Sequence, residues 1–321
     1  MFGLFGKLLY ILMLNNKINI YYITKAIKIA FIIFYFFLLF LPKFLKSNIT
    51  NHVFSDNIDC INVKNKLNNR TQPFDYFNEF LFFTDLISCK IPFSFIRFAD
   101  GEYSIMKGAE INAPDKWHWD TKNQKFKDSL IEAVSICTNP NSFIAIPCKN
   151  WLKVSESIVS LSKCSSAKYM SYSTLFVNKN YHYFKDWILR FINTSFQNRW
   201  KIILVANSII HKRIKWAYKF FPVPNHIVEN WDYYSISLLS KLSEQAKQNN
   251  LIFFVSAGPA ANIIISYLSK INNNNIYIDL GSSIEFITKG YSTRPYAIDG
   301  TENSNHICES FFVKNKTLIY I

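Results

Sequence analysis

Asp100 and Glu102 flank Gly101 in the stretch 97–102, which reads R-F-A-D-G-E. Two carboxylates at this spacing can bind one hard cation through their oxygens, and the glycine lets the chain turn tightly between them. The same spacing also occurs in solvated loops and at helix caps, so the spacing alone does not identify a cation site. Arg97 favours the cation site, because a strand here would bury its guanidinium, and a buried arginine needs an anionic partner.

Ser256 and Gly258 form a second candidate motif, which follows an apolar run. The free amides of a helix N-terminus attract phosphate, and a glycine there lets a phosphate approach the backbone closely. Pro259 supports a helix start, because proline suits the first helical position. An ordinary serine-capped helix fits these residues equally well, since the full G-x-G-x-x-G pattern is absent.

Asp279 ends a third apolar run and precedes Gly281 and Ser282. Its carboxylate could hold a ribose or sugar hydroxyl, or it could only cap the next turn. Arg294 is a further cation expected on the same side, or alternatively a surface charge. In parallel sheets ligands bind outside the carboxyl ends of the strands, which is where all three motifs fall.

Short β-branched or aromatic runs alternate with amphipathic runs of helix length from residue 74 onward. This alternation is typical of α/β proteins with a mostly parallel sheet covered on both faces. No Pro/Gly/Ser-rich break divides residues 90–310, so we predict a single Rossmann-like domain over 74–321. The predicted strands are 94–98, 142–146, 168–171, 201–206, 226–228, 251–256 and 275–280. The predicted helices are 74–90, 124–137, 154–163, 181–192, 209–220, 233–248 and 259–271.

The composition is that of a folded chain with an anionic partner. Of 321 residues, 50% are hydrophobic and 18% charged, which excludes a disordered or fibrous protein. The formal net charge of +14 indicates phospholipid, nucleic acid or a phosphorylated small molecule as a partner. We expect no nucleic acid, because the chain has no P-loop and no RNA-binding aromatic signature, and lysines of the N-terminal segment explain part of the basic excess.

Residues 1–46 are predicted to be a hydrophobic, basic segment that associates with a membrane lipid surface. The stretch 1–55 contains no acidic residue, and 29–41 is an uncharged apolar run. As a helix this run is too short for the ~30 Å hydrocarbon layer, but extension to residue 18 makes it long enough. We expect single-pass or monotopic attachment, with the side of the membrane left open; a cleaved signal and a buried helix are the alternatives. Residues 47–73 are expected to be a linker.

Cysteine and histidine give weaker signals. The six cysteines contain no C-x-x-C pair, so we expect mostly buried, reduced thiols, with disulfides as the alternative. Cys148 follows a predicted strand and is interpreted as a buried thiol rather than a nucleophile. His118 looks like a ligand, but the histidines lie scattered without helical pairing, so a histidine metal cluster is not expected.

Over roughly residues 93–296 the sequence resembles the bacterial glycosyltransferases of the GT-D fold, whose hallmark is a strand ending R-F-G-D-G-E with a D-x-E metal motif. Ala99 stands where that family usually has glycine, and the N-terminal hydrophobic extension lies outside the resemblance. Besides 97–102, the resemblance includes the stretches 145–148 with Trp151, 176–178, 256–259, 278–282 and 293–294.

The resemblance implies transfer of a sugar from a nucleoside diphosphate donor, often UDP-linked, to a glycan or glycoconjugate acceptor. It implies a divalent cation at Asp100 and Glu102, Mn²⁺ or alternatively Mg²⁺, which would stabilise the departing diphosphate. An inverting reaction also needs a general base, for which Glu229 or Asp232, just after a predicted strand, are the candidates. The expected donor-binding residues are Arg97, Gly101, Ser256, Gly258, Asp279, Ser282 and Arg294.

Two other classes of protein remain open at the level of sequence. A metal-dependent phosphoesterase would use the same acids, although it normally needs more carboxylate or histidine ligands than this chain clusters. A non-catalytic, membrane-tethered carbohydrate-binding protein would need neither Asp100 nor Glu102 for its activity.

Overall fold

The computed structural model describes residues 58–113, 117–138, 141–162, 166–193, 201–207, 214–292, 294–298, 300–309, 311–314 and 317–320. The membrane-associating segment predicted at 1–46 lies outside these residues, as does the beginning of the predicted linker. Within the described part of the chain, no helix has both the length and the apolar character that crossing a membrane requires.

Seven strands form one sheet in which every neighbouring pair runs parallel, in the order β5-β4-β1-β9-β8-β6-β7. Nearly every residue of β1, β4, β8 and β9 is buried, as continuous apolar runs predict for strands covered on both faces. The α/β class and the parallel sheet expected from the sequence are therefore confirmed. The strands are β1 (Phe93–Arg97), β4 (Ser142–Ile146), β5 (Met170–Tyr172), β6 (Lys201–Asn207), β7 (Lys219–Val223), β8 (Leu251–Ser256) and β9 (Ile276–Asp279).

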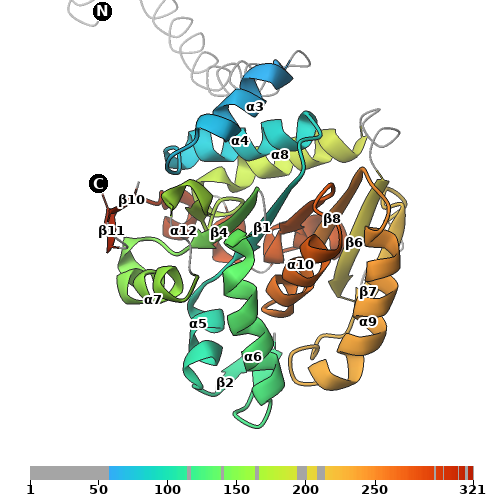
Figure 1. The fold of residues 1–321 in the computed structure, drawn as a ribbon. Helices are drawn as coiled ribbons and strands as arrows, with labels where there is room; N and C mark the ends of the chain where they lie inside the picture. Colours follow the sequence, from blue (N-terminus) through green and yellow to red (C-terminus); the bar gives the residue numbers. More distant parts are fainter. Residues whose placement is uncertain are drawn as a thin grey trace, which may run out of the picture. The chain divides into compact units, whose positions relative to one another are not determined.

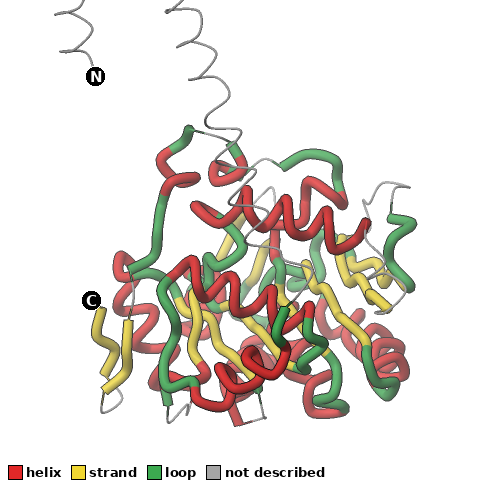
Figure 2. The backbone as a smooth tube through the Cα atoms, turned by 90° about the horizontal axis from the view of Figure 1, so that it is seen from above, coloured by secondary structure: helices red, strands yellow, loops and turns green. Residues whose placement is uncertain are grey.

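Helices cover both faces of this sheet (Figure 1), and the view from above shows the strands between them (Figure 2). On one face Phe83 of α4 packs edge-on against Phe95 and Phe143 of the sheet, at ring-centroid distances of 4.8 and 5.0 Å. On the other face α10 lies against β1 and β9, with α6 and α9 beside it. The helices are α3 (Cys60–Asn69), α4 (Tyr76–Ser88), α5 (Asp100–Lys107), α6 (Gln124–Ala133), α7 (Leu152–Ser162), α8 (Tyr181–Asn193), α9 (Trp231–Ala246), α10 (Ala260–Ile271), α11 (Glu285–Thr288) and α12 (Glu302–Asn305).

Two short antiparallel hairpins stand apart from the main sheet. One pairs β2 (Ile111–Ala113) with β3 (Trp117–Trp119), and the other pairs β10 (Phe311–Lys314) with β11 (Thr317–Tyr320) near the C-terminus.

The last edge strand is the main error in the predicted elements. The strand predicted at 226–228 is a series of turns, and the helix predicted at 209–220 ends inside β7, while residues 208–213 lie outside the described part. β7 contains Pro222 and leaves Phe220 37% exposed. A proline cannot donate to the hydrogen-bond ladder and is tolerated in an edge strand but not in a central one, so Pro222 disfavours the prediction of a strand here.

The predicted linker 47–73 is wrong for its second half, because α3 is a helix joined to the domain. Asp59 caps α3 by accepting hydrogen bonds from Ile61 N and Asn62 N at 3.0 and 3.1 Å. Directly after the helix, Arg70 is 4% exposed and makes a two-pronged ion pair with the buried Glu79, both bonds at 2.7 Å. The sequence did not predict this helix, because the segment is rich in asparagine and only two of the helix side chains are buried, which leaves no clear apolar period.

The expectation of reduced thiols is also wrong for four of the cysteines. Cys60 is joined to Cys89, and Cys148 is joined to Cys308. The first disulfide ties α3 to the end of α4. The second ties the segment after β4 to the C-terminal part of the chain. Sequence spacing could not reveal either pair, because the partners are 29 and 160 residues apart.

Candidate active site

β1 and β9 lie side by side where the two halves of the sheet meet: β1, β4 and β5 form one half, and β6 to β9 form the other. In open parallel sheets, the carboxyl ends of strands at such a reversal of strand order form the binding crevice. Arg97 ends β1 and Asp279 ends β9, so two of the sequence-predicted site residues meet here.

Arg97 is held on all sides. Asn262, a fully buried residue of α10, accepts from Arg97 N at 3.3 Å and donates to Arg97 O at 2.7 Å. The guanidinium Nε lies 3.3 Å from Asp279 Oδ2, and Nη1 donates to Ser173 O at 3.3 Å. The side chain is therefore a fixed cation with 19% of its surface exposed.

The turn after β9 is built around the same arginine. Asp279 Oδ1 accepts from Gly281 N at 2.8 Å, and Ser256 Oγ donates to Gly281 O at 2.6 Å. Gly281 has a φ of +48° and lies so close to Arg97 that a Cβ there would overlap Nη2. The motifs at the ends of β8 and β9, which are separate in the sequence, are thus joined by hydrogen bonds to Gly281.

The buried charges shift the pKa values of this group. Burial raises the pKa of Asp279, although the Arg97 charge opposes the change. Burial acts most strongly on Arg97 and lowers its pKa, but the charges of Asp279, Tyr296 and Glu102 together outweigh burial and leave that pKa raised. Arg97 therefore stays charged.

Asp100 and Glu102 lie in the first turn of α5, directly after β1. Asp100 is exposed, whereas Glu102 is half-buried and its Oε2 accepts from Ala99 N at 2.9 Å. Burial raises the pKa of Glu102 to about 7, with the Asp279 charge adding to the effect. The structure thus gives Glu102 a helix-capping contact and a hydrogen bond to its own backbone, while Asp100 is exposed to solvent.

The larger cavity, which we call the donor cavity after the predicted donor-binding residues in its lining, has a volume of about 510 Å³ and lies over the carboxyl ends of β6, β8 and β9. Five of the predicted donor-binding residues line it. Its cations are Arg97, Lys289 and Arg294, while Glu285 pairs with Lys289 at 2.9 Å. Arg294 Nε is buried and has no hydrogen-bond partner among the described residues. The predicted residues that line the donor cavity are Arg97, Ser256, Gly258, Ser282 and Arg294.

The second cavity, of about 360 Å³, lies on the other side of the β1 end and is lined by Asp100, Trp151, Asn178, Glu302 and His306 among others. In the described part of the chain, no lysine or arginine lines it. It combines two carboxylates and an imidazole with a half-exposed indole.

Glu229, the predicted base, lines neither cavity. Its Oε1 accepts from His118 N at 2.8 Å and lies 3.0 Å from His226 Nδ1. These contacts tie the β2–β3 hairpin to the turns after β7, and the catalytic role of Glu229 stays a prediction. Gly101 lies in the first turn of α5 and Asp279 behind Arg97, and neither is among the lining residues.

Sequence reasoning missed three residues of the site. Tyr296 lies with its hydroxyl 2.7 Å from Ser282 Oγ, and burial raises its pKa. Lys289 lines the donor cavity, and Asn262 holds Arg97 from behind. The nearness of Tyr296 to Arg294, two residues earlier, could have identified it from the sequence. No sequence signal distinguishes Asn262 from the many other asparagines.

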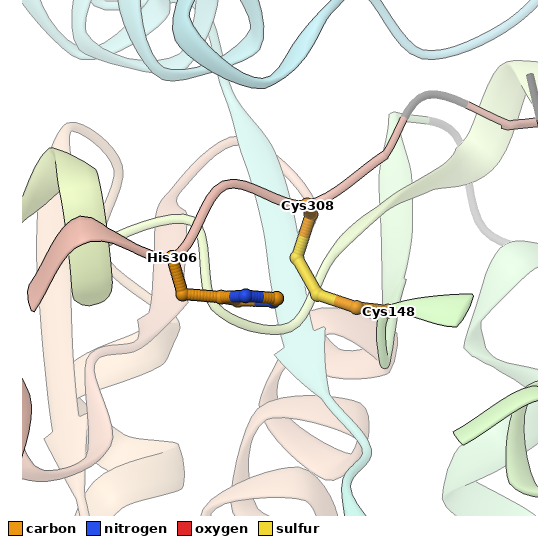
Figure 3. A group of neighbouring side chains, drawn as sticks. All are labelled: Cys148, His306 and Cys308. Atoms are coloured by element: carbon orange, nitrogen blue, oxygen red, sulfur yellow. A yellow bond between two sulfur atoms is a disulfide. The ribbon is translucent and has the colours of Figure 1, made fainter. Parts of the chain in front are cut away.

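Cys148, His306 and Cys308 form a further cluster beside the second cavity, with their potential ligand atoms within 4.8 Å of one another (Figure 3). Because the two sulfurs are joined in a disulfide, they offer no thiolate to a metal ion. The cluster therefore fixes the C-terminal segment, and the cation hypothesis rests on Asp100 and Glu102.

No protein-family model matches the chain, and no curated protein matches it. Two solved structures are similar. One is described as a highly conserved domain of unknown function, 1792, with a distinct glycosyltransferase fold, and the other is the selenomethionine-substituted structure of domain of unknown function 1792. Each is 17% identical to this chain, with a TM-score of 0.47, and the match covers 80% of this chain and 96% of the other.

Proposed function

We propose that the protein is a metal-assisted glycosyltransferase that moves a sugar from a nucleoside diphosphate donor, in the first instance a UDP-sugar, to a glycan or glycoconjugate acceptor. The observation that carries this proposal is the donor cavity, where Arg97, Lys289 and Arg294 gather at the carboxyl ends of parallel strands. A volume of about 510 Å³ is within the range of small-molecule sites.

The donor cavity suits a diphosphate. Arg97 presents a charge that its ion pair with Asp279 holds in place, and Arg294 has a buried N–H without an acceptor among the described residues. The turn at Gly258, with a φ of +56°, brings backbone close to the same cavity. Arginine forks and backbone amides are common partners of phosphate oxygens, so these groups would bind and orient the diphosphate.

Asp100 and Glu102 fit a hard cation, because both offer carboxylate oxygens, the ligands that Mn²⁺ and Mg²⁺ prefer. Asp100 is exposed, and the half-buried Glu102 lies in the same first turn of α5. When bound, the cation would neutralise charge on the departing diphosphate. Arg97 would add a second positive charge that needs no movement during the reaction, which is the condition for efficient electrostatic stabilisation.

A donor screen tests this function. The full chain, in detergent, is incubated with UDP-glucose, UDP-galactose and UDP-N-acetylglucosamine with and without Mn²⁺, and release of UDP is measured. We expect metal-dependent release from at least one donor, lost in Asp100→Asn and Glu102→Gln. Glu110→Gln, an exposed acid just after α5, serves as the control and should retain it.

The rival classes give different results in the same screen. A phosphoesterase would release inorganic phosphate from substrates that carry no sugar. A non-catalytic sugar-binding protein would release no UDP with any donor. Full release after complete chelation would remove the cation from the proposal.

We also propose that residues 1–46 attach the protein to a membrane, from their acid-free, apolar sequence. Fractionation of cells that produce the full chain tests this. Protein that remains in the soluble fraction at low salt without detergent would contradict the attachment.

A further inference from the structure

We propose that the second cavity is the acceptor subsite and that it takes an uncharged sugar at the end of the acceptor. This inference rests on the proposed glycosyltransferase function, and it names the class of acceptor. It is carried by three observations: the position of the cavity, its charge and its exposed tryptophan.

The second cavity shares a wall with the donor cavity. Arg97 lines the donor cavity and Ser173 lines the second one, and Arg97 Nη1 donates to Ser173 O at 3.3 Å. Asp100, three residues after the end of β1, lines the second cavity itself. A transferase must hold two reactants in contact at one point, and two cavities on either side of the β1 end provide that arrangement.

The two cavities differ in charge. Three cations line the donor cavity, whereas the second cavity has the carboxylates of Asp100 and Glu302 and, within the described residues, no lysine or arginine. Asp100 is a proposed ligand of the cation, but Glu302 is not, and its carboxylate disfavours a phosphorylated or otherwise anionic ligand while it accepts hydrogen bonds from sugar hydroxyls. Asn150 and Asn178 add amide donors and acceptors to the same lining. The second cavity is therefore suited to a neutral, hydroxyl-rich group.

Trp151 gives the second cavity an apolar surface. Its side chain belongs to a short 3₁₀ turn, Lys149–Trp151, and the residue is 51% exposed. Because Trp151 lines the cavity, a ligand bound there would cover part of its exposed ring, and burial of an aromatic ring is favourable. The indole would offer a flat apolar face to a sugar ring, while the asparagines and Glu302 would hydrogen-bond its hydroxyls.

The far wall of the second cavity comes from the C-terminal part of the chain. Glu302, Asn303 and His306 line it, and Cys308 joins this segment to Cys148, which also lines the cavity (Figure 3). The Trp151 turn starts directly after Cys148, and Trp151 N donates to Cys148 O at 2.8 Å. The disulfide therefore fixes the tryptophan and the opposite wall relative to each other.

Binding measurements test the inference without relying on turnover. The full chain, in a detergent that has no sugar head group, is titrated by calorimetry with methyl β-glucoside, lactose, chitobiose and glucose 6-phosphate. We expect at least one neutral sugar to bind, and Trp151→Ala to weaken that binding at least tenfold. Tyr233→Ala, which removes an 80% exposed aromatic from α9, is the matched control and should bind within twofold of wild type.

The inference is overturned if none of the three neutral sugars binds, if Trp151→Ala binds them as wild type does, or if glucose 6-phosphate binds more tightly than all of them. The affinity for UDP is measured in the same variants and should stay within twofold, which shows that Trp151→Ala folds.

Failure of this inference and failure of the proposed function give different results. If UDP-sugars are hydrolysed but Trp151→Ala leaves the acceptor KM of sugar transfer unchanged, the acceptor subsite is wrong and the glycosyltransferase function stands. If no donor is hydrolysed but neutral sugars bind through Trp151, the cavity is a sugar site and the proposed function is wrong.

Discussion

Gly281 and Arg97 lie in contact across the sheet, so that a Cβ at position 281 would overlap Nη2 of the guanidinium and lie 2.8 Å from its Cζ. Two separate features therefore disfavour any larger residue at position 281. One is its φ of +48°, and the other is the arginine packed against it. The contact with Arg97 also bears on the proposed function, because Arg97 is a fixed cation of the donor cavity.

Gly281→Ala should displace Arg97 from Asp279 and weaken UDP binding at least tenfold, since the guanidinium cannot stay in place. Gly300→Ala is the control, because Gly300 has a φ of +83° and nothing within 4 Å of the added Cβ. Both variants should lose about 1–2 kcal/mol from backbone strain. Calorimetric titration with UDP measures the difference, and equal affinities in the two variants would show that Arg97 does not bind the diphosphate.

Asn262 should act as a positioning residue through Arg97. Asn262→Ala leaves the backbone N and O of Arg97 without their side-chain partner and should cost about 1–3 kcal/mol of unfolding free energy. It should also weaken UDP binding severalfold, because the β1 end loses its anchor on α10.

Asn275 provides the matched control for Asn262. It is equally buried and hydrogen-bonds Leu251 N, Ala246 O and Gln248 O, but it lines neither cavity. Asn275→Ala should lose a similar amount of stability and bind UDP normally. If both variants lose affinity in proportion to stability, Asn262 has only a structural role.

The buried pair between Arg70 and Glu79 should make the segment before residue 74 necessary for stability. Both side chains are fully buried, and Arg70 also donates to Lys168 O and Met170 O at 2.9 and 2.7 Å. Glu79→Gln should lower the free energy of unfolding by about 3–5 kcal/mol, because it leaves a buried charge unpaired. Glu244→Gln, which breaks an exposed pair with Lys247, should cost less than about 1 kcal/mol. Urea unfolding of both variants checks the prediction.

Sequence patterns predicted those parts of the molecule that depend on local order. The buried strands β1, β4, β8 and β9 have continuous apolar runs, and Arg97, Ser256 and Asp279 stand at strand ends, where parallel sheets place their ligands. Contacts between residues that are far apart in the sequence could not be predicted from such local patterns. Asn262 meets Arg97 across 165 residues, and in a chain rich in asparagine no local pattern distinguishes it from its neighbours.

Other errors have local physical causes. β7 is an edge strand that contains Pro222, and a proline disfavours the prediction of a strand because it cannot donate to the hydrogen-bond ladder. α3 buries only Val63 and Leu67, and it is held by its cap and a disulfide rather than by a broad apolar face. The disulfides themselves depend on contacts that spacing does not encode.

Asp85 should make the stability of the protein fall as the pH rises. Burial raises its pKa from 3.8 to about 6, and the nearby charge of Lys66 opposes the change only in part. A raised folded-state pKa means that the folded chain prefers the protonated acid, so this contribution is complete below pH 4 and is lost as the pH rises through 6. The carboxylate also lies in the last turn of α4, where the helix dipole disfavours a negative charge.

Asp85→Asn should therefore raise the free energy of unfolding at pH 8 by about 1–2 kcal/mol, less than the roughly 3 kcal/mol that the full pKa difference would give, because the group is only half-buried. At pH 4 the variant and the wild type should be equally stable. Urea unfolding at both pH values checks this, and an equal gain at pH 4 would assign the effect to packing rather than to charge.

The disulfide between Cys148 and Cys308 should stabilise the protein and also hold the wall of the second cavity. It closes a loop of 160 residues, whereas Cys60–Cys89 closes one of 29. In the chain-entropy account these loops correspond to about 5 and about 3.6 kcal/mol of stabilisation. The double variant Cys148→Ala/Cys308→Ala should therefore lose more stability than Cys60→Ala/Cys89→Ala.

The two double variants should also differ in which residues show faster amide hydrogen exchange. Only loss of Cys148–Cys308 releases the segment with Glu302 and His306, so amide exchange over residues 301–306 should accelerate at least tenfold in that variant and stay unchanged in the other. Neutral-sugar affinity should fall with it, while UDP affinity should not, because the donor cavity has no wall from this segment. Peptide mapping of the unreduced protein provides the first check. If alkylation finds Cys148 and Cys308 as free thiols, the wall is not held by this bond, and the predicted difference between the two double variants disappears.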